Sequence, residues 1–155
     1  MPFTKKVTPF LWFDDKAHEA AKFYVETFPN SRIISPMTGP GGNPIGVKFE
    51  IDGREFVAFN GGPMFKFTEA ISLFIDCETQ EEVDRIWDRL VSDGGSPSHC
   101  GWLKDKYGLS WQVVPRCLME YMSDPDRVKA GRAMQAMMGM SKLDIAALKA
   151  AFDGV

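Results

Sequence analysis

The order of predicted elements in this chain occurs twice. Residues 7–59 are predicted to form a strand, a helix and then strands in hairpins, and residues 70–114 repeat that order. A shift of 62 residues places Phe13 on Ile75 and Asp14 on Asp76, and a smaller shift places Gly53 on Gly108 because the second half has shorter loops. The sequence therefore predicts two small repeats, which we expect to share a single sheet.

The first repeat begins with an apolar strand predicted over 7–13 and a helix predicted over 16–28. Asp14 and Asp15 are expected to cap this helix, because their carboxylates can accept hydrogen bonds from first-turn amides. Asp52-Gly53 is a hairpin turn signal. Further strands are expected at 32–37, 45–51 and 54–59.

The second repeat is predicted to contain strands over 70–75, 102–104 and 109–114, with a helix after the first of them. Thr79 and Glu82 form a capping box in front of this helix, and Gly94-Gly95 ends it. Asp76 is the repeat equivalent of Asp14, so it is also expected to be a helix cap.

The pattern changes after Pro115 and becomes helical. Asp124-Pro125 has the form of an N-cap followed by proline at the first helical position, which predicts a helix to about Met138. Another helix is predicted from Ser141 onward. The domain prediction is thus residues 1–116, made of repeats at about 1–62 and 63–116, and a helical extension, 117–155, that packs on the domain or on a dimer partner.

Composition excludes several classes of protein. The 155 residues carry a net charge of -3, so there is no basic surplus for nucleic-acid binding. No apolar run is long enough to span a bilayer, and no signal peptide is recognised. Three widely spaced cysteines, Cys77, Cys100 and Cys117, make a poor disulfide framework. We therefore expect a cytoplasmic protein with reduced thiols and no membrane or nucleic-acid partner.

Several segments carry a resemblance to a known family. The most specific is Cys100–Gln112; the others are Thr8–Phe13, Phe23-Tyr24, Phe28–Ser31, Asn60–Pro63, Cys77–Val83 and Met134–Ala151. On these residues the chain resembles the vicinal oxygen chelate superfamily, which includes glyoxalase I, extradiol dioxygenases and fosfomycin-resistance proteins. Within it the chain is similar to the PhnB-like group, labelled 3-demethylubiquinone-9 3-methyltransferase.

The resemblance implies an α+β fold, in which a duplicated βαβββ unit forms half-open barrels and is followed here by C-terminal helices. It also implies a homodimer, often with exchanged strands, and a pocket in each barrel. Metal-dependent relatives hold one divalent ion there through four strand positions, usually His, Gln or Glu.

Transferring those four positions to this chain gives a poor set of metal ligands. Of the four residues, only Gln112 and Thr8 offer a side-chain oxygen, from an amide and a hydroxyl, whereas a valine and an alanine cannot ligate a metal. Glu55 and Glu69 are the nearest carboxylates. We therefore predict no metal and no other cofactor, and no metal-dependent glyoxalase or dioxygenase chemistry. The four positions are Thr8, Val57, Ala70 and Gln112, with Asn60 and Ser72 as alternates.

Strand alternation predicts which side chains line the pocket. If Gln112 faces inward, Ser110 and Val114 do so too, while Trp111 and Val113 pack outward under helices. The alternative is that the aromatic residues simply form the barrel core. The predicted lining is Thr8, Phe10, Trp12, Val57, Asn60, Ala70, Ser72, Trp102, Lys104, Ser110 and Gln112.

Cys100 and Gln112 are weak candidates for a catalytic role. Cys100 is expected to share a strand face with Trp102 and Lys104, and a nearby lysine would lower the pKa of the thiol. The alternative is a surface lysine beside a buried cysteine. The turn Lys104-Asp105-Lys106 is expected to be solvated.

Three functional hypotheses remain. The first is a metal-independent homodimer that binds an unknown small molecule. The second is an enzyme of the same fold with an unknown substrate. The third is a methyltransferase acting on a demethylubiquinone-like phenol, which is doubted because the glycine-rich stretch 38–44 lacks the spacing of a cofactor-binding turn and precedes a strand. That stretch is expected to be a mobile loop at the barrel mouth.

Overall fold

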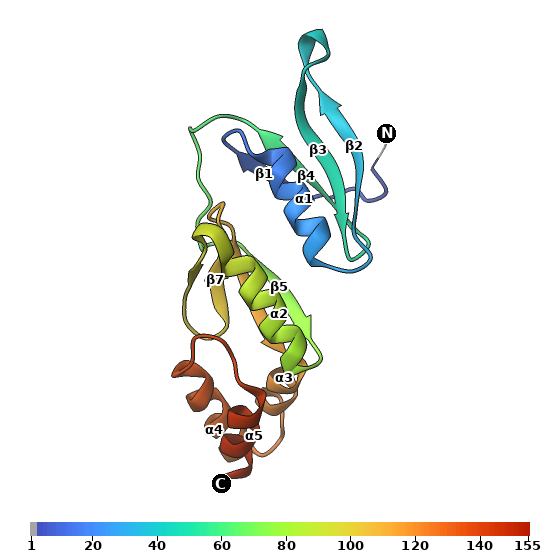
Figure 1. Ribbon diagram of the computed structural model, residues 1–155. Helices are drawn as coiled ribbons and strands as arrows, with labels where there is room; N and C mark the ends of the chain where they lie inside the picture. Colours follow the sequence, from blue (N-terminus) through green and yellow to red (C-terminus); the bar gives the residue numbers. More distant parts are fainter. Residues whose placement is uncertain (1–2) are drawn as a thin grey trace. The chain divides into compact units, whose positions relative to one another are not determined.

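The computed structural model describes residues 3–155 and divides into two compact units, Met1–Phe67 and Thr68–Val155 (Figure 1). Each unit contains its own mixed four-stranded sheet. The expectation of one sheet shared by both repeats is therefore wrong, since each repeat completes its own hydrogen-bonded ladder. Neither sheet closes into a barrel in the part of the chain that is described.

The first unit has βαβββ topology with strand order β1-β4-β3-β2. The edge strand β1 is parallel to β4, and the other pairs are antiparallel. Its β1 starts three residues later than predicted, just after Pro9, which has no N–H to donate to a ladder. The elements are β1 (Phe10–Phe13), α1 (Ala17–Thr27), β2 (Arg32–Thr38), β3 (Pro44–Ile51) and β4 (Arg54–Asn60).

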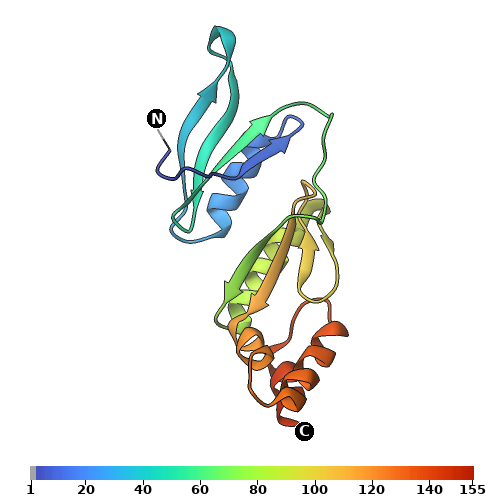
Figure 2. The same ribbon diagram turned by 180° about the vertical axis from the view of Figure 1, so that it is seen from behind.

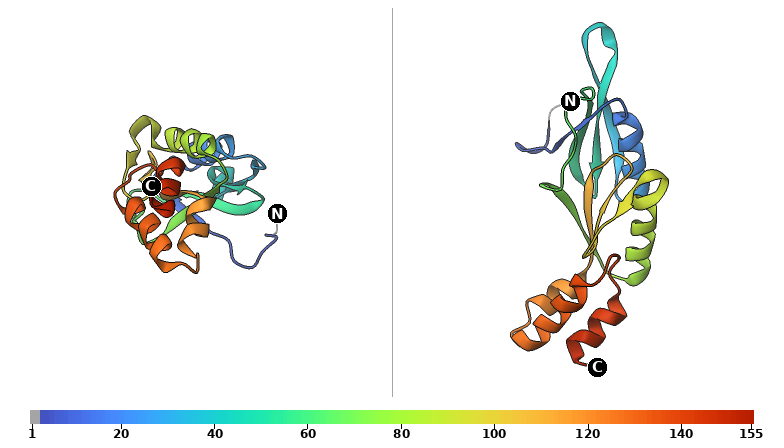
Figure 3. Two further views of the ribbon diagram at one scale, coloured as in Figure 1. Left: turned by 90° about the horizontal axis from the view of Figure 1, so that it is seen from below. Right: turned by 90° about the vertical axis from the view of Figure 1, so that its left-hand side faces the viewer.

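Helix α1 packs on one face of this sheet, where Tyr24 lies beside Phe49, which stacks on Phe56. The hairpin between β3 and β4 turns at Asp52 and Gly53, both with positive φ, as a type I′ turn requires. The glycine-rich stretch forms a short 3-10 turn, Pro40–Gly42, at the tip of the β2–β3 hairpin (Figure 3).

The second unit repeats the topology, with strand order β5-β8-β7-β6. The predicted duplication of a βαβββ unit is thereby confirmed. Trp111 and Val113 are buried, and α2 packs against β7 and β8, as predicted. The elements are β5 (Ser72–Cys77), α2 (Gln80–Val91), a 3-10 turn (Ser92–Gly94), β6 (Ser96–Pro97), β7 (Trp102–Lys104) and β8 (Ser110–Pro115).

The predicted cap at Thr79 is confirmed, but the Glu82 carboxylate does not bind the Thr79 amide as a full capping box requires. The Thr79 hydroxyl accepts a hydrogen bond from the Glu82 amide at 3.2 Å. The Glu82 carboxylate accepts one from the amide of Glu78 at 2.9 Å, one residue before the cap. Two amides near the start of α2 are thereby satisfied by side chains.

The predicted caps Asp14, Asp15 and Asp76 are wrong. At α1, the side-chain oxygen of Asn60 accepts from the Ala17 amide at 2.8 Å, so a residue of β4 takes the place of a local cap. Asp76 instead accepts from the guanidinium of Arg116 at 2.8 Å. In both repeats a partner distant in sequence overrides the local signal.

Three helices follow the second sheet and gather at one end of it (Figure 3). They are α3 (Arg116–Met122), α4 (Arg127–Met138) and α5 (Ile145–Asp153). The sequence did not predict α3, which begins directly after Pro115. Helix α4 is capped by Asp126 rather than Asp124, because the Asp126 carboxylate reaches the amides of Val128 and Lys129.

The C-terminal helices dock on the second unit through apolar and polar contacts. Leu118, Leu143 and Leu148 are buried in one cluster with Val114 of β8. The Gln80 side chain at the start of α2 accepts from the Ile145 amide at 2.7 Å and donates to the Leu143 carbonyl at 3.1 Å. We call this pair of hydrogen bonds the Gln80 clip.

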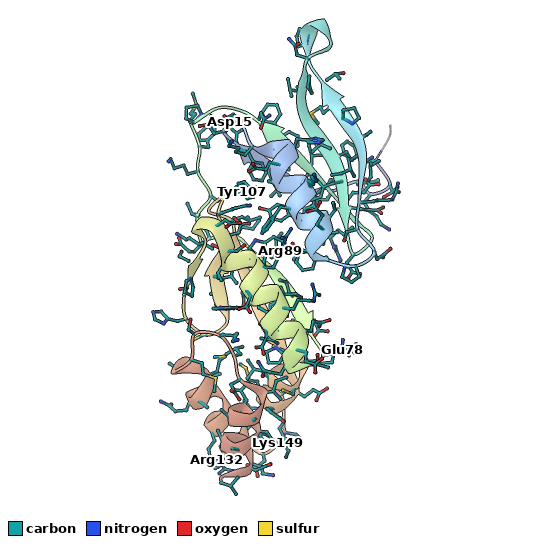
Figure 4. The ribbon with its side chains drawn as sticks, viewed as in Figure 1. Asp15, Glu78, Arg89, Tyr107, Arg132 and Lys149 are labelled. Carbon is teal, nitrogen blue, oxygen red and sulfur yellow. The ribbon has the colours of Figure 1, made fainter. Side chains whose placement is uncertain are left out.

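Within the helical region, Arg132 of α4 donates to the carbonyls of Ala151 and Phe152 at the end of α5 (Figure 4). Lys149 pairs with Asp153 one turn further along α5. The Arg132 hydrogen bonds hold the end of α5 against α4, whereas the Lys149–Asp153 pair lies within α5. None of the helices in residues 3–155 has the length and apolar character needed to cross a membrane.

Candidate functional site

The second sheet carries α2 on one face, and on its other face the C-terminal helical region packs at the end of β8, around Val114. Figure 2 views the unit from that side, with β5 and β8 in front of α2. Strand pairing places six side chains there in two rows, because directly paired residues point to the same side. The first row is Ser72–Ser110–Lys104 and the second is Phe74–Gln112–Trp102, in the order β5, β8, β7.

We call these six residues the two-row face. Successive rows are two residues apart along each strand, or about 7 Å. The Gln112 side-chain N–H donates to the Ser72 hydroxyl at 2.9 Å and links the rows. Phe74 is 49% exposed, and Trp102 and Lys104 are half-buried. Hydroxyls, an amide and an ammonium group therefore lie beside two aromatic rings.

Ser110 lies in the middle of the first row and has an unusual environment. Its side chain is 1% exposed, and its hydroxyl has no hydrogen-bond partner among the residues described. A buried hydroxyl without a partner is costly, because it loses its hydrogen bonds to water without replacement. Lys104, its neighbour on β7, forms an ion pair with Glu69, which lies in the turn before β5.

Five of the predicted lining residues are thus together on one face: Ser72, Trp102, Lys104, Ser110 and Gln112. Ala70 is not on the strand, because β5 begins at Ser72. The Ala70 amide donates instead to the Thr68 side chain within a turn. That these five residues line a binding site remains a prediction.

The candidates in the first unit are less well grouped. Phe10 and Val57 are paired on the sheet face opposite α1, and Trp12 lies edge-on to Phe59 on the same face. Asn60 faces α1, where it accepts from the Ala17 amide, so the structure places it away from that face. Thr8 precedes β1 and lies outside the ladder.

With this geometry established, comparison with known proteins shows the family. Residues 5–114 match the model of the family described as 3-demethylubiquinone-9 3-methyltransferase. This chain belongs to that family. The PhnB protein of Bacillus cereus, a solved structure that bears the same family description, is 35% identical, with a TM-score of 0.65 over 72% of this chain and 99% of that one.

More distant structures share the fold. A Pseudomonas aeruginosa protein is 16% identical, with a TM-score of 0.57 over 72% of this chain and 98% of that one. The fosfomycin-resistance protein FosX of Listeria monocytogenes, solved with Mn(II) and sulfate, is also 16% identical, with a TM-score of 0.51 over 71% of this chain and 90% of that one. The comparison with curated proteins gave no match.

The family match confirms the PhnB-like resemblance and the glyoxalase-like fold. The region that matches the family model ends at residue 114, before the C-terminal helices. The segment Met134–Ala151, which the sequence analysis included in the resemblance, therefore lies outside the match. Methyl transfer is not supported. The two mixed sheets differ from the doubly wound parallel sheet that S-adenosylmethionine enzymes usually use, and the glycine-rich stretch is a hairpin tip.

The donor groups in this chain do not fit the divalent ion that metal-dependent members of the superfamily hold. At the family positions, Val57 is apolar and buried, and Ala70 lies in a turn. Gln112 offers only an amide oxygen, a weak ligand by itself. Residues 3–155 contain no group of three or more His, Cys, Asp or Glu side chains that could hold a metal. Metal independence remains a prediction, and it now rests on this donor set.

The two carboxylates nearest to those positions already have partners. Glu69 pairs with Lys104. Glu55 pairs with Lys48 at 3.4 Å and accepts from the Thr4 amide. Burial raises the pKa of Glu55, but hydrogen bonds from Thr4 and Lys48 outweigh it and leave the pKa below its ordinary value. Both carboxylates serve as ion-pair partners.

Asp105 was missed as a functional position, because the turn around it was expected to be solvated. Its side chain is 2% exposed. One carboxylate oxygen accepts from the amides of Tyr107 and Leu109, at 2.8 and 3.1 Å. The other accepts from the Trp111 indole at 2.9 Å. An aspartate whose side chain accepts from the amide two residues further on is a known sequence signal for a turn. The burial of Asp105, however, depends on Trp111, which the local signal does not reveal.

Asp105 therefore shapes the two-row face without belonging to it. Its three hydrogen bonds hold the connection between β7 and β8, and the paired residues Lys104 and Ser110 lie at the ends of those strands. This is a positioning role, since Asp105 itself faces away from the open side with Trp111.

Cys100 is placed differently from the prediction. It lies in the turn before β7 with a φ of 59°, and its amide donates to the Met140 carbonyl at 2.8 Å. The alternation of a strand does not apply there, so Cys100 does not share the face of Trp102 and Lys104. The ammonium group of Lys104 pairs with Glu69 rather than with a thiol.

We expect no more than two thiols to react quickly with a thiol reagent in the folded protein at pH 8. Burial raises the pKa of Cys77 to about 12, so about one Cys77 thiol in ten thousand is ionised at that pH. Burial also raises the pKa of the half-buried Cys117. Colorimetric titration should give three thiols after denaturation. A Cys77→Ala variant should keep the same fast-reacting thiols, and a third fast thiol in the native protein would contradict this assignment.

Proposed function

We propose that this PhnB-like protein binds a small molecule without a resident metal, and that it does so as a homodimer. The observation that carries the proposal is the two-row face. It combines aromatic rings with a few oriented polar groups, which is the usual character of small-molecule sites. The link from Gln112 to Ser72 fixes the orientation of the amide and leaves its carbonyl oxygen as an acceptor for a ligand.

The lack of a suitable set of metal ligands among residues 3–155 supports binding by direct contacts. Hydrogen bonds from Ser72, Ser110 and Gln112 and contact with the rings of Phe74 and Trp102 would hold the ligand. Such groups bind and orient a molecule, but they supply no Lewis acid. We therefore favour a binding role over the metal-dependent reactions of the superfamily.

The homodimer is supported by an apolar side chain on the open face of the first sheet. Phe10 is 55% exposed on the face of the first sheet opposite α1. Helix α1 covers only one face of the first sheet, so a second copy of the chain could bury the other. Dimers with two-fold symmetry are the commonest homo-oligomers of soluble proteins. Sedimentation at micromolar concentration should give a particle of two chains, and a particle of one chain would refute the homodimer.

The binding proposal is tested by calorimetry with a panel of small aromatic compounds, neutral and charged. Protein treated with a chelator should bind the same compounds as untreated protein. Gln112→Leu should weaken binding about fivefold or more, the effect of losing one hydrogen bond. Gln135→Leu, a change on the exposed side of α4, is the matched control and should have no effect.

Two outcomes would contradict the proposal. If no compound of the panel binds the wild-type protein, small-molecule binding at this face is wrong. If binding disappears with chelator and returns with Mn²⁺ or Zn²⁺, the metal-independent part is wrong.

A further inference from the structure

The first row of the two-row face has the chemistry of an anion site. Lys104 supplies a positive charge, and the hydroxyls of Ser72 and Ser110 lie beside it in strand register. The Ser72 hydroxyl accepts a hydrogen bond from Gln112, so its own proton is available to donate. An ammonium group and two hydroxyl donors in one row match the two oxygens of a carboxylate.

The buried Ser110 hydroxyl is an independent indication of a ligand. It lies between Ser72 and Lys104 with no partner among the described residues, although its side chain is 1% exposed. Native proteins rarely leave a buried polar group unpaired, and such a group calls for an explanation. A ligand oxygen above the first row would satisfy it.

A carboxylate of the chain itself already binds to this row. Glu69 lies in the turn before β5, and its carboxylate contacts the Lys104 ammonium group. The hydrogen bond from Lys104 lowers the pKa of Glu69, which is therefore ionised at neutral pH. Both side chains are substantially exposed, and an exposed ion pair contributes little net stability. Glu69 can therefore be exchanged for another anion.

The second row indicates what is attached to that anion. Phe74 and Trp102 flank Gln112 about 7 Å from the first row. A ring joined to a carboxylate by a short spacer can contact both rows at once. A phosphate or a larger anion would fit Lys104, but it would leave the aromatic row without contact.

We propose that the two-row face binds a small aromatic carboxylic acid, and that Glu69 is a built-in competitor that leaves Lys104 when the ligand arrives. The proposal rests on the proposed small-molecule function and adds the class of ligand and its competitor. The carboxylate binds Lys104, Ser110 and Ser72, and the ring lies against Phe74 and Trp102.

The test compares 3-phenylpropionate with its neutral amide by calorimetry, at fixed pH and salt. Wild-type protein should bind the acid more tightly than the amide. Glu69→Gln should strengthen binding of the acid about two- to fivefold, the range expected for release of an exposed ion pair, and leave the amide unchanged. Lys104→Met should weaken binding of the acid about tenfold or more.

Matched variants separate a local effect from a general one. Lys106→Met removes the same charge from the neighbouring turn and should leave both affinities unchanged. Lys104→Arg keeps the charge and should retain preference for the acid. Ser110→Ala should weaken binding of the acid more than binding of the amide. Each variant's melting temperature shows that it is folded.

The outcomes distinguish the two proposals. If acid and amide bind equally, or if Glu69→Gln leaves the affinity for the acid unchanged, the carboxylate site is wrong while small-molecule binding stands. If neither probe binds but other compounds of the aromatic panel do, the ligand class is wrong. If nothing in the panel binds, the proposed function itself fails.

Discussion

Replacing Asp105 by alanine is expected to lower the free energy of unfolding by about 3–4 kcal/mol. The change removes a buried carboxylate that accepts three hydrogen bonds, from two backbone amides and the Trp111 indole. Hydrogen bonds to a charged group are worth more than neutral ones, and the three donors would be left buried without an acceptor. Denaturant unfolding followed by tryptophan fluorescence measures the loss.

Two variants test the cause of that loss. Asp105→Asn keeps an acceptor for the amides of Tyr107 and Leu109 but can place an N–H group against the Trp111 indole, so it should be intermediate. Asp88→Ala, on the exposed side of α2, should change stability by no more than about 0.5 kcal/mol. If Asp105→Ala were as mild as Asp88→Ala, the buried hydrogen bonds would not stabilise this turn.

The second large effect is expected at Gly101, which directly precedes β7 and packs against Leu143, just before α5. Gly101 has a φ of +85°, and an added Cβ would lie 2.9 Å from both the Leu143 side chain and the Val113 carbonyl oxygen. Gly101→Ala combines a strained backbone, about 1–2 kcal/mol, with overpacking of about 1–3 kcal/mol. We expect a total loss of about 2–5 kcal/mol in the same unfolding measurement.

Gly108 provides the matched control. Its φ is +86°, almost the same as that of Gly101, but an added Cβ would meet nothing within 4 Å. Gly108→Ala should therefore cost only the backbone strain, about 1–2 kcal/mol. Equal losses at the two glycines would show that the close contacts with Leu143 and the Val113 carbonyl oxygen add nothing to the loss of stability.

The sequence predicted the parts of the fold that depend on local periodicity. The duplicated βαβββ order follows from hydrophobic spacing and turn residues, and the positions of Ser110 and Gln112 on one strand face follow from the period of two. Trp111 and Val113, on the other face, are buried as that period requires. The cap at Thr79 was equally readable, because its partner lies within four residues.

The errors involve partners far apart in the chain. Asp14 was a reasonable local cap, but Asn60, which is 43 residues away from Ala17, occupies that place. The Glu69–Lys104 pair likewise joins a turn to a distant strand. Local patterns carry no information on such pairs.

The Gln80 clip has a consequence for how this chain can vary in evolution. Both polar atoms of the Gln80 side chain bind backbone groups of residues 143 and 145, which lie beyond the region shared with the family model. In a protein that has only the two repeats, a glutamine at this position would have no such groups to bind. We therefore expect selection to hold glutamine at position 80 only in lineages that also carry the C-terminal helices, so that the residue and the extension are inherited together.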